Sequence, residues 1–190
     1  SQFIYVVLFL ISKLVIVKFI VANLYAVIMK TLYLIRHAKS SWEYDLPDAE
    51  RPLNDRGKND AHLMGKFLGD LDKTIDLVMS SPANRAYTTA KIITKYLGVK
   101  EENILINKDL YDFSGNQVLK VIKSTSDEIE RLLIFGHNHA FTSLVNMLGD
   151  KYIDNLPTAG FVEIQFEENE WNNISVGKNL LSIFPKMLKK

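Results

Sequence analysis

The 190-residue sequence contains no cysteine, and this absence excludes disulfide bonds, thiolate catalysis and cysteine-ligated zinc. It also has no large surplus of either charge, since 23 basic and 22 acidic residues leave a formal net charge of +1. No overall field favours nucleic acid or an acidic membrane, so we expect no nucleic-acid partner, and any anion must be bound by a few placed side chains. The composition that is present, 47% hydrophobic and 24% charged, is typical of a globular protein.

One long apolar stretch stands at the start of the chain, over residues 1–28. A membrane-spanning helix needs about 20 apolar residues. Lys13 and Lys18 interrupt the stretch near its middle, and each costs roughly 2.5–3.5 kcal/mol at the centre of a bilayer. A signal peptide would have a basic residue before the apolar run and a clear small-residue cleavage site, and neither is present. Because Met29 directly precedes the first predicted strand, we interpret residues 1–28 as an upstream extension that the working protein lacks, with a membrane segment or a signal as the alternatives.

Residues 29–190 are expected to form one domain of a cytoplasmic protein, with a membrane partner only if residues 1–28 are a true membrane segment. Strand and helix patterns alternate as far as Gly149, which predicts an α/β fold: a three-layer α/β/α sandwich with a mainly parallel central sheet. Strands are predicted at residues 32–35, 75–79, 104–106, 131–135 and 161–166, with 171–176 as a hairpin partner of the last. Helices are predicted from the N-cap Asn54 to about residue 71, from the N-cap Ser81 with Pro82 in its first turn to Gly98, over 114–124, and from about 140 to 149.

Charged and imidazole side chains stand where several of these elements end or begin. The first strand stops at Arg36 and His37, and in open α/β sheets the ligand crevice lies outside the carboxyl ends of the strands. His137 follows the fourth predicted strand in the same way. Arg85 falls in the first turn of a helix, where a cation is unfavourable on helix-dipole grounds unless an anion is bound at that helix end.

Together these four residues suit phosphoryl transfer. Arginine binds phosphate oxygens bidentately and stays charged, so Arg36 and Arg85 are candidate phosphate ligands. Neutral imidazole is nucleophilic near pH 7, and attack by His37 on phosphorus would give a covalent phosphohistidine. A protonated His137 would stabilise charge as it builds on the equatorial oxygens. We expect no cofactor and no metal, because the arginines and His137 can supply the positive charge.

Each of these residues also has a plainer interpretation. Arg36 and His37 fit a strand end with solvated side chains, and Arg85 fits a surface position on a helix. The run from Gly136 to His139 fits a turn with a capping Asn138. Its two histidines also suggest a metal site, but no adjacent carboxylate completes the ligand set.

The loop over residues 39–51 is long and polar with aromatic residues in it, which predicts the rim of a pocket. Trp42 and Tyr44 in this loop fit packing anchors and substrate contacts equally well.

Four motifs in this order resemble the histidine phosphatase superfamily, which has the phosphoglycerate mutase-like fold. They are Leu34-Ile35-Arg36-His37-Ala38-Lys39-Ser40, Pro52-Leu53-Asn54-Asp55-Arg56-Gly57, Ser80-Ser81-Pro82 with Arg85-Ala86 and Thr89-Ala90, and Gly136-His137-Asn138. The later Pro157-Thr158-Ala159-Gly160 is similar to a segment of the small SixA-type phosphohistidine phosphatase branch. The resemblance covers residues 29 to about 166.

The resemblance implies a phosphatase that uses His37 as its nucleophile. It also implies Arg36 and Arg85 as phosphate ligands and His137 as the second histidine of the site. Within the same motifs, Ser40 and Asn138 are assigned to substrate binding.

The sequence departs from the superfamily pattern at two points. Ala38 stands where the usual motif has Gly, which still meets the need for a small residue. Larger members carry a Glu proton donor after the third strand, and here that region offers Asp109 and Asp112 without a match. An N-phosphorylated leaving group is easier to expel than an alcohol, so a site without a strong acid suits phosphohistidine.

The chain also lacks long insertions that would cover a sugar phosphate. We therefore expect the partner to be a phosphorylated protein, through phosphohistidine, or a small phosphorylated metabolite. The alternatives are a sugar phosphomonoesterase or mutase of the same fold and a non-catalytic phosphate-binding module.

Overall fold

The computed structural model describes residues 13, 29–43 and 45–189 of the chain. Apart from Lys13, the interpretation of residues 1–28 falls outside the described residues, and so does that of Tyr44. The domain boundary at residue 29 and the cytoplasmic location therefore stay predictions. Among the described residues, no helix has the length and apolarity that crossing a bilayer requires.

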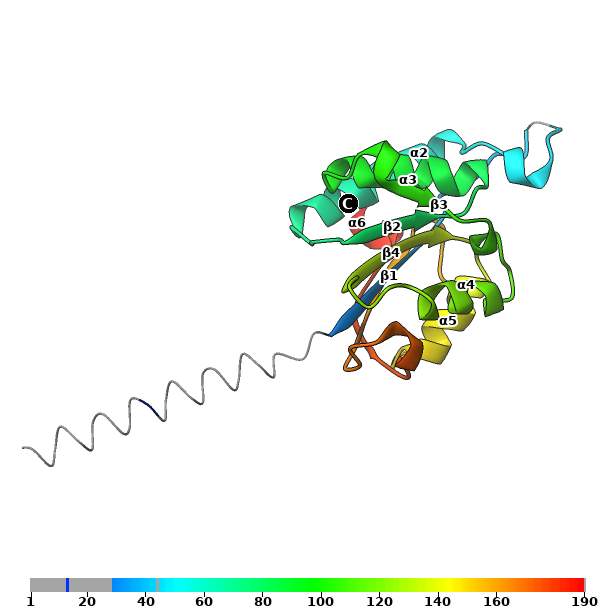
Figure 1. The fold of residues 1–190 in the computed structure, drawn as a ribbon. Helices are drawn as coiled ribbons and strands as arrows, with labels where there is room; N and C mark the ends of the chain where they lie inside the picture. Colours follow the sequence, from blue (N-terminus) through cyan, green and yellow to red (C-terminus); the bar gives the residue numbers. More distant parts are fainter. Residues whose placement is uncertain (1–12, 14–28, 44, 190) are drawn as a thin grey trace, which may run out of the picture.

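The described residues form a six-stranded sheet in the order β3-β2-β4-β1-β5-β6 (Figure 1). Its strands are β1 (Lys30–Arg36), β2 (Leu77–Ser80), β3 (Ile104–Ile106), β4 (Arg131–Gly136), β5 (Phe161–Phe166) and β6 (Lys178–Ile183). Neighbouring strands from β3 to β1 pair in parallel, whereas β5 is antiparallel to both β1 and β6. The predicted mainly parallel sheet is confirmed.

Helices cover both faces of this sheet, as Figure 1 shows. On one face lie α2 (Asp55–Asp70) and α3 (Asn84–Tyr96), and on the other lie α4 (Asn116–Lys123) and α5 (Ala140–Leu148). The short α6 (Pro185–Leu188) packs against α2 near the end of the chain. The short 3₁₀ turns are η1 (Asp48–Glu50), η2 (Glu101–Asn103), η3 (Lys108–Leu110) and η4 (Trp171–Asn173). The three-layer α/β/α sandwich is therefore confirmed.

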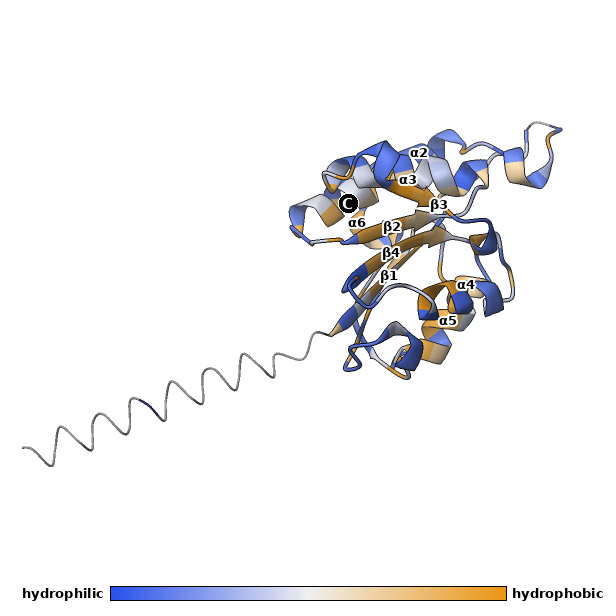
Figure 2. Ribbon diagram, in the orientation of Figure 1, coloured by the Kyte–Doolittle hydropathy of each residue, from blue (hydrophilic) through white to orange (hydrophobic). Residues whose placement is uncertain are grey.

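The middle of strand β1, residues 32–35, is hydrophobic because both faces of the strand are buried. Leu32 and Leu34 belong to the hydrophobic cluster under α4 and α5, whereas Tyr33 and Ile35 belong to the cluster under α2 and α3. Successive side chains of a strand point to opposite faces, so one strand supplies both clusters. Figure 2 shows the central strands as predominantly hydrophobic. This burial holds the carboxyl end of β1 rigidly in place.

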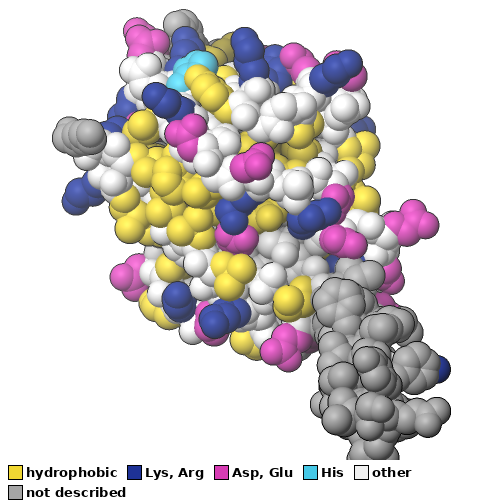
Figure 3. Space-filling view, turned by 90° about the vertical axis from the view of Figure 1, so that its left-hand side faces the viewer, with side chains coloured by type: hydrophobic (Ala, Val, Ile, Leu, Met, Phe, Trp, Pro, Cys, Tyr) yellow, Lys and Arg dark blue, Asp and Glu magenta, His cyan; other side chains and the backbone are white. Residues whose placement is uncertain are grey.

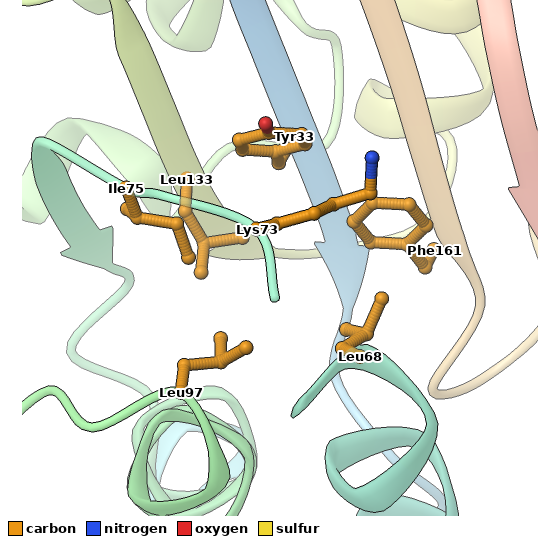
Figure 4. Close-up of a pocket in the computed structure, with 7 residues that line it drawn as sticks. All are labelled: Tyr33, Leu68, Lys73, Ile75, Leu97, Leu133 and Phe161. Carbon is orange, nitrogen blue, oxygen red and sulfur yellow. The ribbon is translucent and has the colours of Figure 1, made fainter. Parts of the chain in front are cut away.

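A small apolar cavity of about 10 Å³ lies between the α2–α3 layer and the sheet. Figure 4 shows Leu68 and Leu97 on the helical side and Tyr33, Leu133 and Phe161 on the sheet side. A volume of roughly 10–15 Å³ is the minimum for one water molecule. This cavity is therefore a feature of core packing and not a ligand site.

The start of α3 differs from the prediction. Asn84 is the first helical residue and Ala83 is the N-cap, so Ser81 is not the cap and Pro82 lies before the helix. The Ser81 hydroxyl instead lies 2.8 Å from His137 Nε2 and accepts a bond from the Ala83 N–H at 3.3 Å. The other predicted cap is confirmed, since the Asn54 side chain accepts from the Gly57 N–H at 2.8 Å.

The predicted hairpin partner at residues 171–176 is wrong. Residues Trp171–Asn173 form η4, and β6 pairs with β5 instead. The physical reason is the Trp171 side chain, which is fully buried and donates from Nε1 to the Ile129 carbonyl at 2.7 Å. That anchoring places residues 171–173 against the core beside α4, where they do not pair with β5.

Charged side chains of both signs are interspersed over the face shown in Figure 3, in keeping with a net charge of +1. A group of hydrophobic side chains lies among them on the same face.

Candidate active site

The parallel pairing of β1 with β4 brings two histidines together. Arg36 and Gly136 are partners in the register, and the His37 N–H donates to the Gly136 carbonyl at 2.9 Å. His37 and His137 therefore leave the sheet at the same level, with their ring centroids 5.3 Å apart. Since the carboxyl ends of parallel strands meet at one edge, this juxtaposition follows from the topology.

The segment before β5 fixes the end of β1. The Ala159 N–H lies 3.1 Å from the Arg36 carbonyl and 3.2 Å from the His37 carbonyl, with Ala159 at a φ of 55°. Arg36 Nη1 donates to the Leu156 carbonyl at 2.8 Å. Arg36 Nε is buried and has no hydrogen-bond partner among the described residues. One side of the guanidinium is thus anchored while Nε remains a free donor.

The hydrogen bond at His37 Nδ1 determines which ring nitrogen is free. Nδ1 lies 2.8 Å from the Ala38 carbonyl oxygen, and because a carbonyl only accepts, Nδ1 carries the proton. Burial, with nearby arginines, lowers the pKa of His37 to about 3, so the ring is neutral at pH 7. The lone pair is therefore on Nε2, which is the nitrogen available to a ligand.

Arg85 connects both histidines and is 3% exposed, so its interpretation as a surface residue is wrong. Its Nε lies 3.4 Å from His37 Nε2, and its Nη2 lies 3.4 Å from His137 Nδ1. The Thr89 hydroxyl of the same helix accepts from the Ala38 N–H at 2.9 Å, which ties α3 to the end of β1. The start of α3 thus delivers a buried cation between the two imidazole rings.

His137 is neutral in the ligand-free protein. Its Nδ1 faces the Arg85 guanidinium, which only donates, so Nε2 carries the proton and donates to the Ser81 hydroxyl at 2.8 Å. Burial and the charge of Arg85 lower the pKa of His137 to about 3. The predicted protonated state of His137 therefore requires a bound anion, whose negative charge would raise this pKa.

The two buried histidines lead to a titration prediction. Neither His37 nor His137 is expected to titrate between about pH 5 and 8 in the ligand-free protein, because burial disfavours the charged ring. Ring-nitrogen NMR checks this, with His37→Gln and His137→Gln used to assign the signals. Adding inorganic phosphate should move the His137 titration to higher pH. A ring that titrates near pH 6.5 without phosphate would contradict the assigned states.

Asp48 belongs to the site although no sequence pattern singled it out. Its Oδ2 accepts from Arg85 Nη2 at 2.8 Å and from the Tyr111 hydroxyl at 2.6 Å. Its Oδ1 accepts from Arg51 Nη1 at 2.9 Å. The Tyr111 hydrogen bond, followed by Arg85 and Arg51, lowers the pKa of Asp48 to about 2. The sequence predicts that the loop over residues 39–51 lines the site. It does not indicate which charged side chains of that loop reach the cavity.

Arg51 is the second residue that the sequence did not single out. Its Nη2 donates to the Ser40 hydroxyl at 2.6 Å, and its guanidinium carbon lies 3.2 Å from the centroid of the Trp42 ring. Trp42 itself is 77% exposed. Trp42 is therefore a rim residue stacked on a buried arginine rather than a core anchor.

These side chains surround a cavity of about 320 Å³. The cavity is lined by Arg36, His37, Lys39, Ser40, Trp42, Asp48, Arg51, Arg85, Phe113, His137, Asn138, His139 and Thr158. Three guanidinium groups and one ammonium group face a single carboxylate, so the lining is suited to a multiply charged oxyanion such as phosphate. All of the predicted site residues are brought together here.

The predicted substrate contacts Ser40 and Asn138 already have partners. The Ser40 hydroxyl accepts from Arg51, and the Asn138 amide donates to Asn155 Oδ1 at 2.8 Å. His139 lines the cavity but is exposed. Across the described part of the chain, no group of three or more His, Asp or Glu side chains is arranged to hold a metal ion.

The two carboxylates after the third strand do not line the cavity. Asp112 accepts from the N–H groups of Ser114 and Gln117 at 2.8 and 2.9 Å, so it organises the start of α4. Asp109 is exposed. Neither residue occupies the position of a proton donor in this structure.

Known proteins are similar to this chain in sequence and in fold. A family model for the histidine phosphatase superfamily (branch 1) matches residues 32–133. An uncharacterized chloroplastic protein of Arabidopsis thaliana is 29% identical over 153 residues, which cover 76% of this chain and 70% of that protein.

Two solved structures show the likeness of the fold. The SixA protein of Agrobacterium tumefaciens, which carries the name phosphohistidine phosphatase, superposes with a TM-score of 0.69 at 22% identity, covering 81% of this chain and 97% of that one. Mycobacterial glucosyl-3-phosphoglycerate phosphatase superposes with a TM-score of 0.60 at 11% identity, covering 80% and 98%. At these identities the structures establish the fold alone. The family match covers more than half of the chain, and the protein therefore belongs to the histidine phosphatase superfamily and is a phosphatase.

Proposed function

We propose that the protein is a metal-independent phosphatase that hydrolyses protein phosphohistidine through a covalent phosphohistidine intermediate on His37. The observation that carries this proposal is the state of His37. Its neutral ring is held by the Ala38 carbonyl, so that the Nε2 lone pair points into the site and accepts only a long hydrogen bond from Arg85 Nε, at 3.4 Å. An oriented, unprotonated imidazole surrounded by cations is what nucleophilic attack on a phosphoryl group requires.

The proposed reaction has two displacements. The phosphoryl oxygens bind to the guanidinium groups of Arg36 and Arg85, which both line the cavity, and these fixed cations stabilise the charge on the equatorial oxygens. His37 Nε2 then forms a bond to phosphorus as the bond to the leaving group breaks. In the second displacement, water attacks phosphorus, the N–P bond breaks and His37 regains its lone pair. His137, with its pKa raised by the bound phosphoryl group, donates a hydrogen bond to it.

The accessibility of the site supports a phosphorylated protein as the substrate. The cavity is bordered by exposed aromatic side chains, Trp42 and Phe113, and not by a covering domain of the described chain. A phosphoryl group on a protein side chain can enter such a site while the remainder of the protein stays outside. The fold likeness to a protein named phosphohistidine phosphatase points to the same substrate class.

A small phosphorylated metabolite is the second candidate substrate. The cavity of about 320 Å³ is at the lower end of the volumes of small-molecule sites, roughly 300–1,000 Å³. The fold is also shared with mycobacterial glucosyl-3-phosphoglycerate phosphatase. These two observations make a sugar phosphate the natural comparison in a test of the substrate.

A comparison of substrates at equal concentration tests this proposal. We expect kcat/KM for a phosphohistidine-bearing protein to exceed that for sugar phosphates by at least about tenfold, a difference of about 1.4 kcal/mol in transition-state binding. Equal or higher values for a sugar phosphate would reject the proposed substrate but not the phosphatase activity. Binding of inorganic phosphate without turnover of any substrate would instead support a non-catalytic binding module.

A further inference from the structure

Asp48 is the single carboxylate among the described residues that line the cavity. It reaches the cavity from η1, on the loop between β1 and α2, and its side chain is 47% exposed. The remaining charged groups of the lining are cations. A carboxylate repels a bound phosphate, so its presence in an anion-binding cavity calls for a chemical role.

The position of Asp48 relative to the reacting centre follows from Arg85. One guanidinium group contacts His37 Nε2 at 3.4 Å, His137 Nδ1 at 3.4 Å and Asp48 Oδ2 at 2.8 Å. A phosphoryl group bound between His37 and Arg85 therefore has Asp48 next to it. Asp48 is also half exposed, so it lies on the solvent-accessible side of the cavity and a substrate that enters from solvent can reach it.

We propose that Asp48 is the general acid and base of the reaction, a role that rests on the proposed function. In the first displacement, the carboxylic acid form of Asp48 transfers its proton to the leaving oxygen or nitrogen as the bond to phosphorus breaks and the His37 Nε2–P bond forms. In the second, the resulting carboxylate takes a proton from the attacking water as the new P–O bond forms and the N–P bond breaks. Asp48 is then protonated again, phosphate is released, and all protons balance.

The binding of substrate explains how Asp48 acquires its proton. In the ligand-free protein Arg85, Arg51 and Tyr111 all donate hydrogen bonds to the Asp48 carboxylate. On its other side Arg85 contacts the neutral His137. A phosphoryl group competes for these donors and adds negative charge beside the carboxylate, and both effects favour the protonated form. A substrate that arrives as a monoanion brings the proton with it.

This role widens the substrate class of the site. A nitrophenolate leaves without protonation, and an imidazole leaving group depends less on an acid than an alcohol does, because alkoxide is a poor leaving group. With Asp48 as an acid, the site also hydrolyses alkyl phosphomonoesters such as phosphoserine peptides or sugar phosphates. Without it, the site would be limited to substrates with good leaving groups.

The test compares Asp48→Asn with the wild type on phosphoserine peptide and on p-nitrophenyl phosphate. For phosphoserine peptide we expect the single-turnover rate to fall by at least about 10²-fold, the usual contribution of a general acid. For p-nitrophenyl phosphate we expect the initial burst of nitrophenolate to persist while the steady-state rate falls, because only the second displacement loses its base. Asp45→Asn and Asp109→Asn, which change carboxylates outside the cavity, should match the wild type on both substrates.

Three outcomes would overturn the proposal. An equal loss of the burst and of the peptide reaction would show that Asp48 only positions Arg85 and Arg51. A lower KM with an unchanged single-turnover rate would show that Asp48 merely competes with phosphate. A wild type that hydrolyses p-nitrophenyl phosphate but not the peptide would show that no acid operates. Failure of the proposed function itself is distinguishable, since the wild type would then release no nitrophenolate from p-nitrophenyl phosphate and form no phosphorylated His37.

Discussion

His37→Ala is expected to lower turnover by at least about 10⁴-fold on every substrate, because the removed imidazole is the proposed nucleophile and loss of a covalent nucleophile removes the whole two-step route. Neighbouring groups cannot replace it, since the Nδ1–H bond to the Ala38 carbonyl orients this ring alone. The measurement is kcat on p-nitrophenyl phosphate, which reports the loss without dependence on an acid.

Two controls separate loss of chemistry from loss of structure. His37→Gln retains most of the volume of this buried side chain and should be as inactive as His37→Ala while keeping the thermal midpoint of the wild type within a few degrees. His62→Ala, which changes an exposed histidine on α2, should retain full activity. Substantial turnover by His37→Gln would contradict the nucleophile assignment.

Arg85→Lys is expected to lower kcat/KM by about 10²–10³-fold although it preserves the charge. The Arg85 guanidinium contacts His37, His137 and Asp48 at the same time, and a single ammonium group cannot reproduce that planar arrangement. Both the KM for substrate and the inhibition constant for inorganic phosphate should rise, since the lost contacts include those to phosphate oxygens.

The matched control is Arg56→Lys on α2, where the arginine is 69% exposed and lies outside the cavity. It should leave kcat/KM unchanged. An unaltered inhibition constant for phosphate in Arg85→Lys would show that Arg85 does not bind the phosphoryl group. Its role would then be limited to positioning Asp48.

The layers of the fold and four residues of the site were predictable from the sequence because local patterns determine them. The apolar run of β1 requires burial on both faces, and Arg36 and His37 mark its end. The misplaced start of α3 shows the limit of such patterns: Ser81 followed by Pro82 has the local preference of a helix entry, but the hydroxyl contacts His137 from another strand. Long-range contacts of this kind leave no mark in the local sequence.

The state of the site could not be predicted, since it depends on burial and on groups from distant segments. His137 is neutral because burial and Arg85 lower its pKa, whereas the sequence suggested a protonated ring. Asp48, Arg51 and Tyr111 meet only through the fold of two loops. The apparent lack of an acid after the third strand therefore does not favour phosphohistidine by itself, because Asp48 offers a carboxylate from a different loop.

Covalent transfer of the phosphoryl group to His37 is best tested by trapping the phosphorylated chain. Protein mixed with excess substrate and quenched in base within one turnover should carry phosphate that is stable to base and labile to acid, and mass spectrometry of its peptides should map the phosphate to His37. The same phosphate should be absent from His37→Gln and should accumulate in Asp48→Asn. Turnover without such phosphate, or phosphate on His137 in place of His37, would contradict the claim.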